Sequence, residues 1–178
     1  MQPIVNKNSC RQTRAHQRGT GLAELVVLLP LLLLMLLVSV DFGRYVYNNQ
    51  VLIDLTREAA NMASRGTEPA DVFAAGFLTQ GTLNVVANGG VIISEVRRHS
   101  TTDATPWIFA QYRNGGLGST ASRVGALNGR ATIPNVTQVQ LGVTMMAVEM
   151  VYPFVPAFDL ARLGLHLYPN ALYDVAYF

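Results

Sequence analysis

Glu24 is the only carboxylate in a segment whose other residues suit a lipid environment, and its position invites a chemical explanation. It stands in the stretch RGTGLAELVVLLP, five residues after Gly19 and four after Thr20. An ionised carboxylate in an apolar medium is unfavourable unless a cation neutralises it, and about 2–3 kcal/mol is typical deep in a membrane helix. The chemistry to expect at Glu24 is therefore ion pairing, or contact with water at the membrane surface.

The other residues that could perform catalysis or bind a metal form no recognisable motif. The histidines His16, His99 and His166 are far apart and belong to no HxxxH or HExxH pattern. The glycine-rich stretch NGGLGST lacks the Gly-Lys-Ser/Thr ending of a phosphate-binding loop. Cys10 is the only cysteine, which excludes an internal disulfide. We expect no catalytic residues, no metal site, no cofactor and no enzymatic activity.

Charge is distributed unevenly along the chain. The 178 residues, half of them hydrophobic, suit one modest domain. Residues 1–19 contain four basic residues and no acidic residue, whereas the rest of the chain has nine basic and 11 acidic residues and a net charge of −2. The basic character therefore belongs to a short N-terminal segment, and nucleic acid is not expected as a partner.

The basic segment is followed by an apolar run that is long enough to cross a bilayer. Residues 21–40 form a helix of about 30 Å at roughly 1.5 Å per residue, which matches the hydrocarbon thickness. The bases before the run, against two bases and three acids in residues 41–58, predict a cytoplasmic N-terminus by the positive-inside rule. The C-terminal part is then expected across the membrane.

Three interpretations fit a basic segment before an apolar run. A secretory signal peptide needs small residues at a cleavage site after the run, and LLVSVDFGR offers none at the required positions. An uncleaved single-pass anchor explains every feature except Glu24. In the third interpretation the chain is cut between Gly19 and Thr20, so that Glu24 becomes the fifth residue. This pattern resembles the type III signal of bacterial prepilins.

The resemblance is more specific over residues 18–66, which are similar to the start of TadE-like proteins, pilin-like components of the Tad (tight adherence, Flp) pilus machinery. It rests on the stretch REAANMASRG at 57–66 and on Gly19, Glu24, Pro30, Asp41, Phe42, Gly43 and Arg44. The family more often has Val-Glu-Phe around the glutamate, where this chain has Ala-Glu-Leu. A TadF-like protein and a more distant minor pilin therefore stay open beside a TadE-like one.

The resemblance implies a structural minor pilin or pseudopilin that assists assembly of a Tad pilus. It implies a single-pass protein of the bacterial inner membrane, with a periplasmic C-terminal domain, either retained there or incorporated in an extracellular pilus. The implied partners are the prepilin peptidase, TadF-like and other pilin-like subunits, the inner-membrane pilus platform and membrane lipid. The alternatives are an uncleaved, anchored periplasmic binding or envelope domain, and a minor pilin of a type IV pilus or type II secretion system.

Four residues carry the expected site. The resemblance assigns leader cleavage to the bond between Gly19 and Thr20. Glu24 is expected to pair with the new N-terminal ammonium group, in its own subunit or in a neighbour. Pro30 has no N–H, so the carbonyl of Val26 loses its helical partner, and a bend is expected at residues 26–30.

The rest of the chain predicts an α+β fold. The helix is expected to continue to Arg65 and end at Gly66, and a second helix is expected from an N-cap at Thr67, through Pro69, to about Leu78. The first helix is expected to be amphipathic over residues 41–66. The apolar stripe of this helix contains Tyr45, Val46, Leu52, Ile53, Ala59, Ala60 and Ala63, and its polar face contains Arg44, Gln50, Asp54, Arg57, Glu58, Asn61 and Arg65.

Four strands are expected at 90–99, 106–114, 139–152 and 171–178. Met146, Val148, Met150 and Tyr152 share one face of the third, and Tyr173, Val175 and Tyr177 share one side of the fourth. Residues 114–130 are expected to form a flexible loop, and Arg97, Arg98 and His99 a solvated strand end.

The expected architecture is a long N-terminal helix, membrane-spanning in its first half, packed on a small antiparallel sheet in a pilin-like manner. The expected divisions are a basic leader at 1–19, a transmembrane half of the helix at 20–40, an amphipathic periplasmic half at 41–66 and a periplasmic α+β domain at 67–178.

Overall fold

The structure is a computed structural model, and it describes residues 12–75, 79–80, 83–100, 105–115, 121–134, 139–158 and 167–178. The chain divides into two compact units, Met1–Gly43 and Arg44–Phe178. The helix α1, Gln12–Ser64, contributes to both units, and each part of it is described with its own unit.

Helix α1 ends where the sequence predicts. Gly66 has a φ of 84°, a left-handed conformation that glycine adopts without strain. The N–H of Gly66 donates to the carbonyl of Ala63, and the N–H of Thr67 donates to the carbonyl of Met62. These two bonds form a Schellman motif, which satisfies carbonyls that the helix end leaves without partners. The start was predicted too late, because α1 begins at Gln12 and not near Gly21.

In the first unit, the apolar side chains of α1 are exposed around its whole circumference. This continuous exposed series comprises Leu25, Val26, Val27, Leu28, Leu29, Leu31, Leu32, Leu33, Leu34, Met35 and Leu36. Among the described residues, α1 is the one helix long and apolar enough to cross a membrane; its span is Glu24–Ser64, and its mean hydropathy reaches 2.8 over 18 residues. The expected apolar helix is confirmed.

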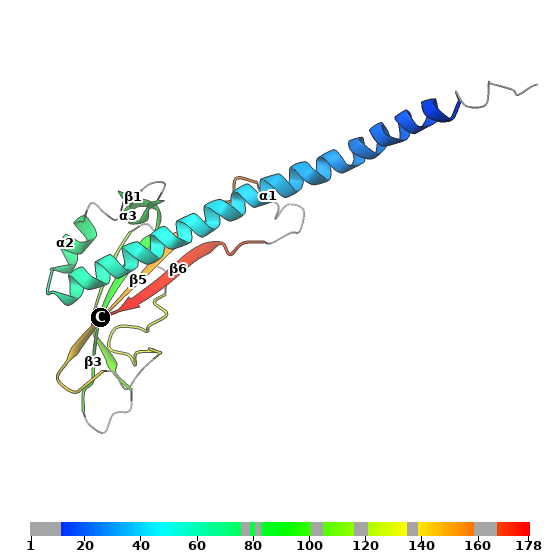
Figure 1. The fold of residues 1–178 in the computed structure, drawn as a ribbon. Helices are drawn as coiled ribbons and strands as arrows, with labels where there is room; N and C mark the ends of the chain where they lie inside the picture. Colours follow the sequence, from blue (N-terminus) through cyan, green and yellow to red (C-terminus); the bar gives the residue numbers. More distant parts are fainter. Residues whose placement is uncertain are drawn as a thin grey trace, which may run out of the picture. The chain divides into compact units, whose positions relative to one another are not determined.

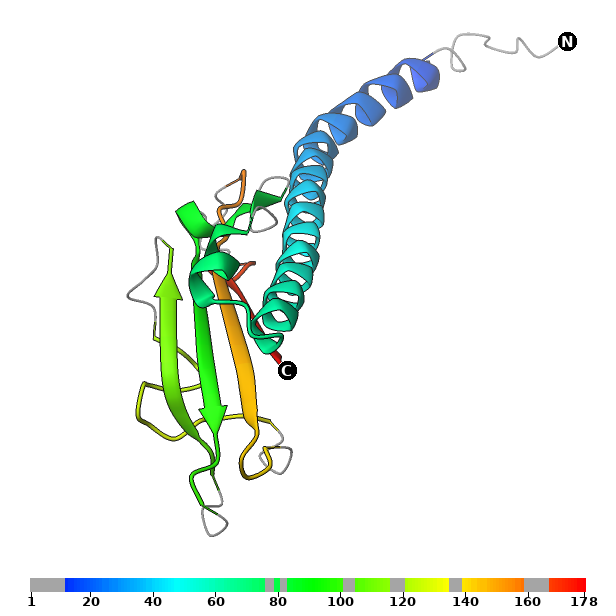
Figure 2. The same cartoon turned by 90° about the vertical axis from the view of Figure 1, so that its left-hand side faces the viewer.

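The second unit contains a four-stranded sheet in which all neighbouring strands are antiparallel. Its strands are β3 (Gly90–Arg97), β4 (Trp107–Asn114), β5 (Thr144–Pro153) and β6 (Ala171–Tyr177), in the order β4-β3-β5-β6. Figure 2 shows β4, β3 and β5 side by side. The expected α+β fold is confirmed. The third strand begins later than position 139, because the turn at Gly142, with a φ of 82°, precedes it.

Short elements precede the sheet. They are α2 (Pro69–Ala74), β1 (Thr79–Gln80), β2 (Leu83–Asn84) and α3 (Val85–Asn88). Pro69 opens α2 as predicted, but the N-cap residue is Glu68 and not Thr67. Helix α2 ends at Ala74 because Ala75 is extended, and Leu78 lies outside the described residues. Helix α3 was not predicted; its first turn is capped by the side chain of Asn84, which accepts from the N–H of Ala87 at 2.9 Å.

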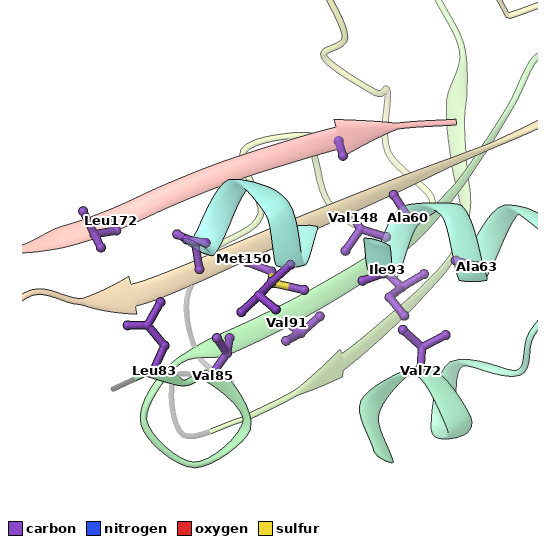
Figure 3. Packing of buried hydrophobic residues seen from close by; sticks show 14 of the residues in the cluster. Ala60, Ala63, Val72, Leu83, Val85, Val91, Ile93, Val148, Met150 and Leu172 are labelled. Atoms are coloured by element: carbon purple, nitrogen blue, oxygen red, sulfur yellow. The ribbon is translucent and has the colours of Figure 1, made fainter. Parts of the chain in front are cut away.

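The main core lies between the second part of α1 and one face of the sheet (Figures 1 and 3). Alanines on α1 present little bulk, so the helix packs closely on the strands. The predicted apolar stripe is confirmed at Tyr45 and Leu52 and at the three alanines, although Leu55 and Thr56 are also buried. The cluster combines α1 and sheet residues: Leu52, Leu55, Ala59, Ala60, Ala63, Val91, Ile93, Val148, Met150 and Leu172.

An aromatic group closes one part of this core. Tyr45 of α1 packs edge-on against Phe154, with ring centroids 5.3 Å apart. Tyr168 contacts both rings, at 5.7 Å from Tyr45 and 5.6 Å from Phe154. The aromatic residues that follow β5 in the sequence therefore fix this strand end to the helix.

The opposite face of the sheet is covered by a segment without regular secondary structure. Val124, Ala131, Ile133 and Val139 are buried there against sheet residues that include Val96, Ile108 and Ala147. The expectation of a flexible loop over 114–130 is wrong for residues 121–130, which pack on the sheet, whereas 116–120 lie outside the described residues. The sheet is thus covered on both faces.

Candidate functional site

The four residues expected to form the N-terminal site all lie within α1. Gly19 and Thr20 have helical backbones, and the side chain of Thr20 is outside the described set. Glu24 and Pro30 lie further along the same helix and are exposed. Residues 20 and 24 are one helical turn apart, which places them on the same side of the helix.

Helix α1 continues through Pro30 without interruption. Proline still removes the hydrogen bond that its own N–H would donate to the carbonyl of Val26. The local bend at residues 26–30 stays a prediction.

The exposed apolar surface of the first unit calls for an apolar partner. Burial of a leucine or valine side chain is worth about 1.5–3 kcal/mol, and this surface contains eleven large apolar residues interrupted only by Pro30. A contiguous patch of this kind marks a membrane or protein interaction site. Lipid or an apolar surface of another protein could bury it.

Glu149 forms a second polar site, which the sequence analysis missed. It is fully buried on β5, on the face covered by residues 121–134. Its Oε1 accepts from the backbone N–H of Arg123 at 2.7 Å and of Val124 at 3.3 Å, and from the Tyr173 hydroxyl at 2.7 Å. The hydroxyl of Ser122 donates to its Oε2. These donors together satisfy a carboxylate that would otherwise be costly to bury.

The surroundings of Glu149 indicate a structural role. Arg123 stacks over the ring of Tyr173, with its guanidinium carbon 3.9 Å from the ring centroid. Burial, followed by the hydrogen bond and charge of Glu149, raises the pKa of Tyr173 above its usual range, so the phenol stays protonated. The Tyr173 hydroxyl and the backbone N–H groups of Arg123 and Val124 therefore all donate to the Glu149 carboxylate, which attaches the 122–125 segment to the sheet.

A cleft on the sheet edge brings basic and aromatic side chains together. We call it the arginine–aromatic cleft; it has a volume of about 590 Å³ and is lined by Arg97, Arg98, His99, Trp107, Ile108, Phe109 and Asn128. Phe109 is the extra residue of a β-bulge, because Glu95 pairs with Ala110 and Val96 pairs with Ile108. The solvated strand end expected at residues 97–99 is therefore one wall of a cleft.

Neighbouring groups contact two arginines in or beside this cleft. Arg97 forms a salt bridge with Glu95 at 3.0 Å and stacks over Phe109 at 4.3 Å. Arg130 lies over Trp107 at 6.0 Å. The Nε of Arg98 is buried and has no hydrogen-bond acceptor among the described residues.

The histidines do not come together in the part of the chain that the structure describes. His99 is exposed and lines the cleft, the side chain of His16 is outside the described set, and His166 lies in the undescribed range 159–166. Over the described residues, no group of three or more His, Cys, Asp or Glu side chains is placed to hold a metal ion.

Part of the chain matches a known protein family. The model of the family described as TadE-like protein matches residues 19–61. No curated protein and no solved structure matched the chain. The matched range begins at Gly19, contains Glu24 and Pro30, and covers the exposed apolar part of α1 together with most of the helix that packs on the sheet. Residues 19–61 of this chain are therefore similar to TadE-like proteins.

Proposed function

We propose that the protein is a structural minor pilin or pseudopilin that assists assembly of a Tad pilus in the bacterial envelope. The observation that carries this proposal is the coincidence of the TadE-like match at residues 19–61 with the exposed apolar surface of α1. A helix of this kind needs lipid before assembly and can exchange it for neighbouring helices afterwards. The role is structural and not enzymatic.

The proposed topology follows from charge and length. The basic segment 1–19 stays in the cytoplasm, residues 20–40 cross the inner membrane, and the amphipathic part of the helix at 41–66 and the domain at 67–178 lie in the periplasm. The large exposed apolar side chains at positions 25–36 fall inside the proposed span, and the polar face that begins at Arg44 falls outside it.

The proposed cleavage after Gly19 creates a cation that can pair with Glu24. A prepilin peptidase cuts after Gly19, a residue small enough for a narrow membrane active site, and leaves Thr20 with a free ammonium group. That cation lies one helical turn from Glu24, or is offered by a neighbouring subunit whose helix is displaced along the bundle axis. Pairing across subunits would fix the register of neighbouring helices, because an unpaired ion at the edge of lipid is unfavourable.

The proposed partners follow from this arrangement. The peptidase recognises the leader, TadF-like and other pilin-like subunits contact the apolar helix, and the inner-membrane platform receives the processed subunit. Membrane lipid covers the helix before assembly. Pro30 would supply a local bend at residues 26–30, and the freed carbonyl of Val26 would be satisfied by water or by a neighbouring subunit.

N-terminal sequencing of the protein purified from the membrane fraction of a piliated host tests the proposal. The expected first residue is Thr20. A chain that begins at Met1, in a host whose other prepilins are processed, would instead support an uncleaved anchored domain. The same preparation identifies partners, because pilin-like subunits are expected to co-purify with the processed form.

A further inference from the structure

We propose that the arginine–aromatic cleft binds a carboxylate-bearing carbohydrate, an oligosaccharide that contains uronic acid residues. This inference concerns the second unit and is independent of the role proposed for α1. It rests on the charge of the cleft, its exposed aromatic rings, the buried Nε of Arg98 and the hydrogen bonds that the backbone of β4 already makes.

The charge of the cleft suits a single carboxylate. Among the described residues, its lining contains two arginines and a histidine and no acidic residue, and Arg130 lies beside Trp107. Glu95 neutralises Arg97 through a salt bridge, which leaves Arg98 as the lining arginine best suited to a ligand. A carboxylate matches the planar fork of a guanidinium, because two parallel hydrogen bonds can form between them.

Arg98 lines the cleft, and its backbone is held in place without a ligand. Its backbone forms a bridge to Leu141, which fixes the start of the side chain. Its Nε is buried and donates to no acceptor among the described residues, an uncommon state for a buried cationic N–H. A ligand carboxylate would supply an acceptor that the described residues do not.

The aromatic rings suit a sugar. Trp107 and Phe109 keep 37% and 62% of their surface exposed, although both are large and apolar. A pyranose ring presents one face of C–H groups that can cover such a ring, while its hydroxyls stay hydrogen-bonded at the rim. Asn128 supplies a side-chain amide at the rim of the same cleft. Arg97 stacks over the Phe109 ring, and Arg130 lies 6.0 Å from the centre of the Trp107 ring.

The backbone argues against an extended acidic peptide as the ligand. Peptides that bind at a sheet edge add a strand through main-chain hydrogen bonds. Here the backbone N–H of Ile108 donates to the carbonyl of Gly129 at 2.9 Å, and the carbonyl of Ile108 accepts from the backbone N–H of Asn128 at 3.0 Å. The edge of β4 inside the cleft is therefore already paired, and recognition falls to side chains.

Trp107 makes the test direct because it is the only tryptophan in the chain. The full-length protein in detergent micelles is titrated with tetragalacturonate while tryptophan emission is recorded. Three further titrations use an uncharged maltotetraose, a tetraglutamate peptide and inorganic phosphate. We expect a saturable change in emission with tetragalacturonate, and binding at least about tenfold weaker for each of the other three.

Variants separate recognition from folding. Arg98→Gln and Arg98→Lys are both expected to weaken tetragalacturonate binding by about tenfold or more, since neither keeps the bidentate guanidinium. Arg113→Gln is the matched control, because Arg113 is an exposed arginine of β4 outside the cleft lining. Circular dichroism and the midpoint of thermal unfolding verify that the variants fold as the wild type does.

Four results would overturn the proposal. The first is no change in emission with tetragalacturonate, and the second is equal binding of maltotetraose, which would remove the role of charge. The third is tetraglutamate or phosphate binding as tightly as the oligosaccharide. The fourth is unchanged binding in a folded Arg98→Gln protein. None of these results bears on processing at Gly19, so the proposed function stands or falls separately.

Discussion

The hydroxyl of Tyr173 on β6 donates a hydrogen bond to Glu149 on β5, with 2.7 Å between the two oxygens. Glu149 is paired in register with Val175, so Tyr173 is its diagonal neighbour on the same face of the sheet. The carboxylate also accepts from the backbone of Arg123 and Val124. One buried side chain thus connects two strands to the segment that covers them.

Removal of this carboxylate is expected to destabilise the second unit. Glu149→Ala leaves a buried hydroxyl and two backbone amides without their acceptor, and we expect a loss of about 3 kcal/mol in the free energy of unfolding. Chemical denaturation, monitored through the fluorescence emission of Trp107, measures this loss in the free energy of unfolding. The control is Glu58→Ala on the exposed face of α1, where a change within about 0.5 kcal/mol is expected. Equal stability of the two variants would contradict the structural role of Glu149.

Stability is expected to fall in alkaline solution. Burial and Glu149 raise the pKa of Tyr173 above the ordinary tyrosine value of about 10, and burial also raises the pKa of Tyr177. The folded state therefore holds these protons more tightly than the unfolded state. This contribution is fully present below about pH 10 and is lost as the pH rises from there toward the folded-state pKa values.

Denaturation at several pH values between 8 and 11.5 tests the alkaline effect. Tyr173→Phe is expected to reduce the decline in stability above pH 10, since one of the two raised groups is gone. Tyr47→Phe, which removes an exposed hydroxyl of α1, serves as the control. An identical decline in wild type and Tyr173→Phe would show that Tyr173 does not contribute to it.

Gly19→Val is expected to block removal of the leader. A β-branched side chain beside the scissile bond crowds the active site of a membrane peptidase, so the variant should keep residues 1–19. Intact-mass spectrometry of the membrane fraction distinguishes the two forms. Gly43→Ala is the control, because a Cβ at Gly43 meets nothing within 4 Å. Equal processing of wild type and Gly19→Val would refute the assigned cleavage site.

Glu24→Gln is expected to separate processing from assembly. The amide is nearly isosteric and uncharged, so insertion and cleavage after Gly19 should continue, while association with other pilin-like subunits should weaken. Co-purification of those subunits from membranes measures the loss. Glu58→Gln removes an equal charge from the exposed face of the same helix and should leave association intact. Undiminished co-purification together with normal piliation would remove the role assigned to Glu24.

The C-terminal domain is expected on the periplasmic side. In inverted inner-membrane vesicles, a C-terminal epitope should therefore resist added protease until detergent is present. In spheroplasts the same epitope should be accessible. Digestion in intact inverted vesicles would contradict the topology that the flanking charges predict.

Several features follow from the sequence because they depend on neighbours along the chain. The exposed residues of α1, such as Arg44, Asp54 and Glu58, recur at helical spacing, and Gly66 ends the helix through its own backbone freedom. Alternation along β5 likewise places Met146, Val148, Met150 and Tyr152 at the main core. The local pattern alone was sufficient for these features.

Only the tertiary structure decided how distant segments meet. Ser122 and Tyr173 lie 27 and 24 residues from Glu149 in the sequence, and nothing in their local patterns joins them. The same holds for the cleft, whose walls come from residues 97–99, 107–109 and 128. Strand register, the bulge at Phe109 and the packing of Val124 and Ile133 bring these groups together. Such contacts depend on chain closure over long separations and on cooperative packing, which the periodicity of a single segment does not encode.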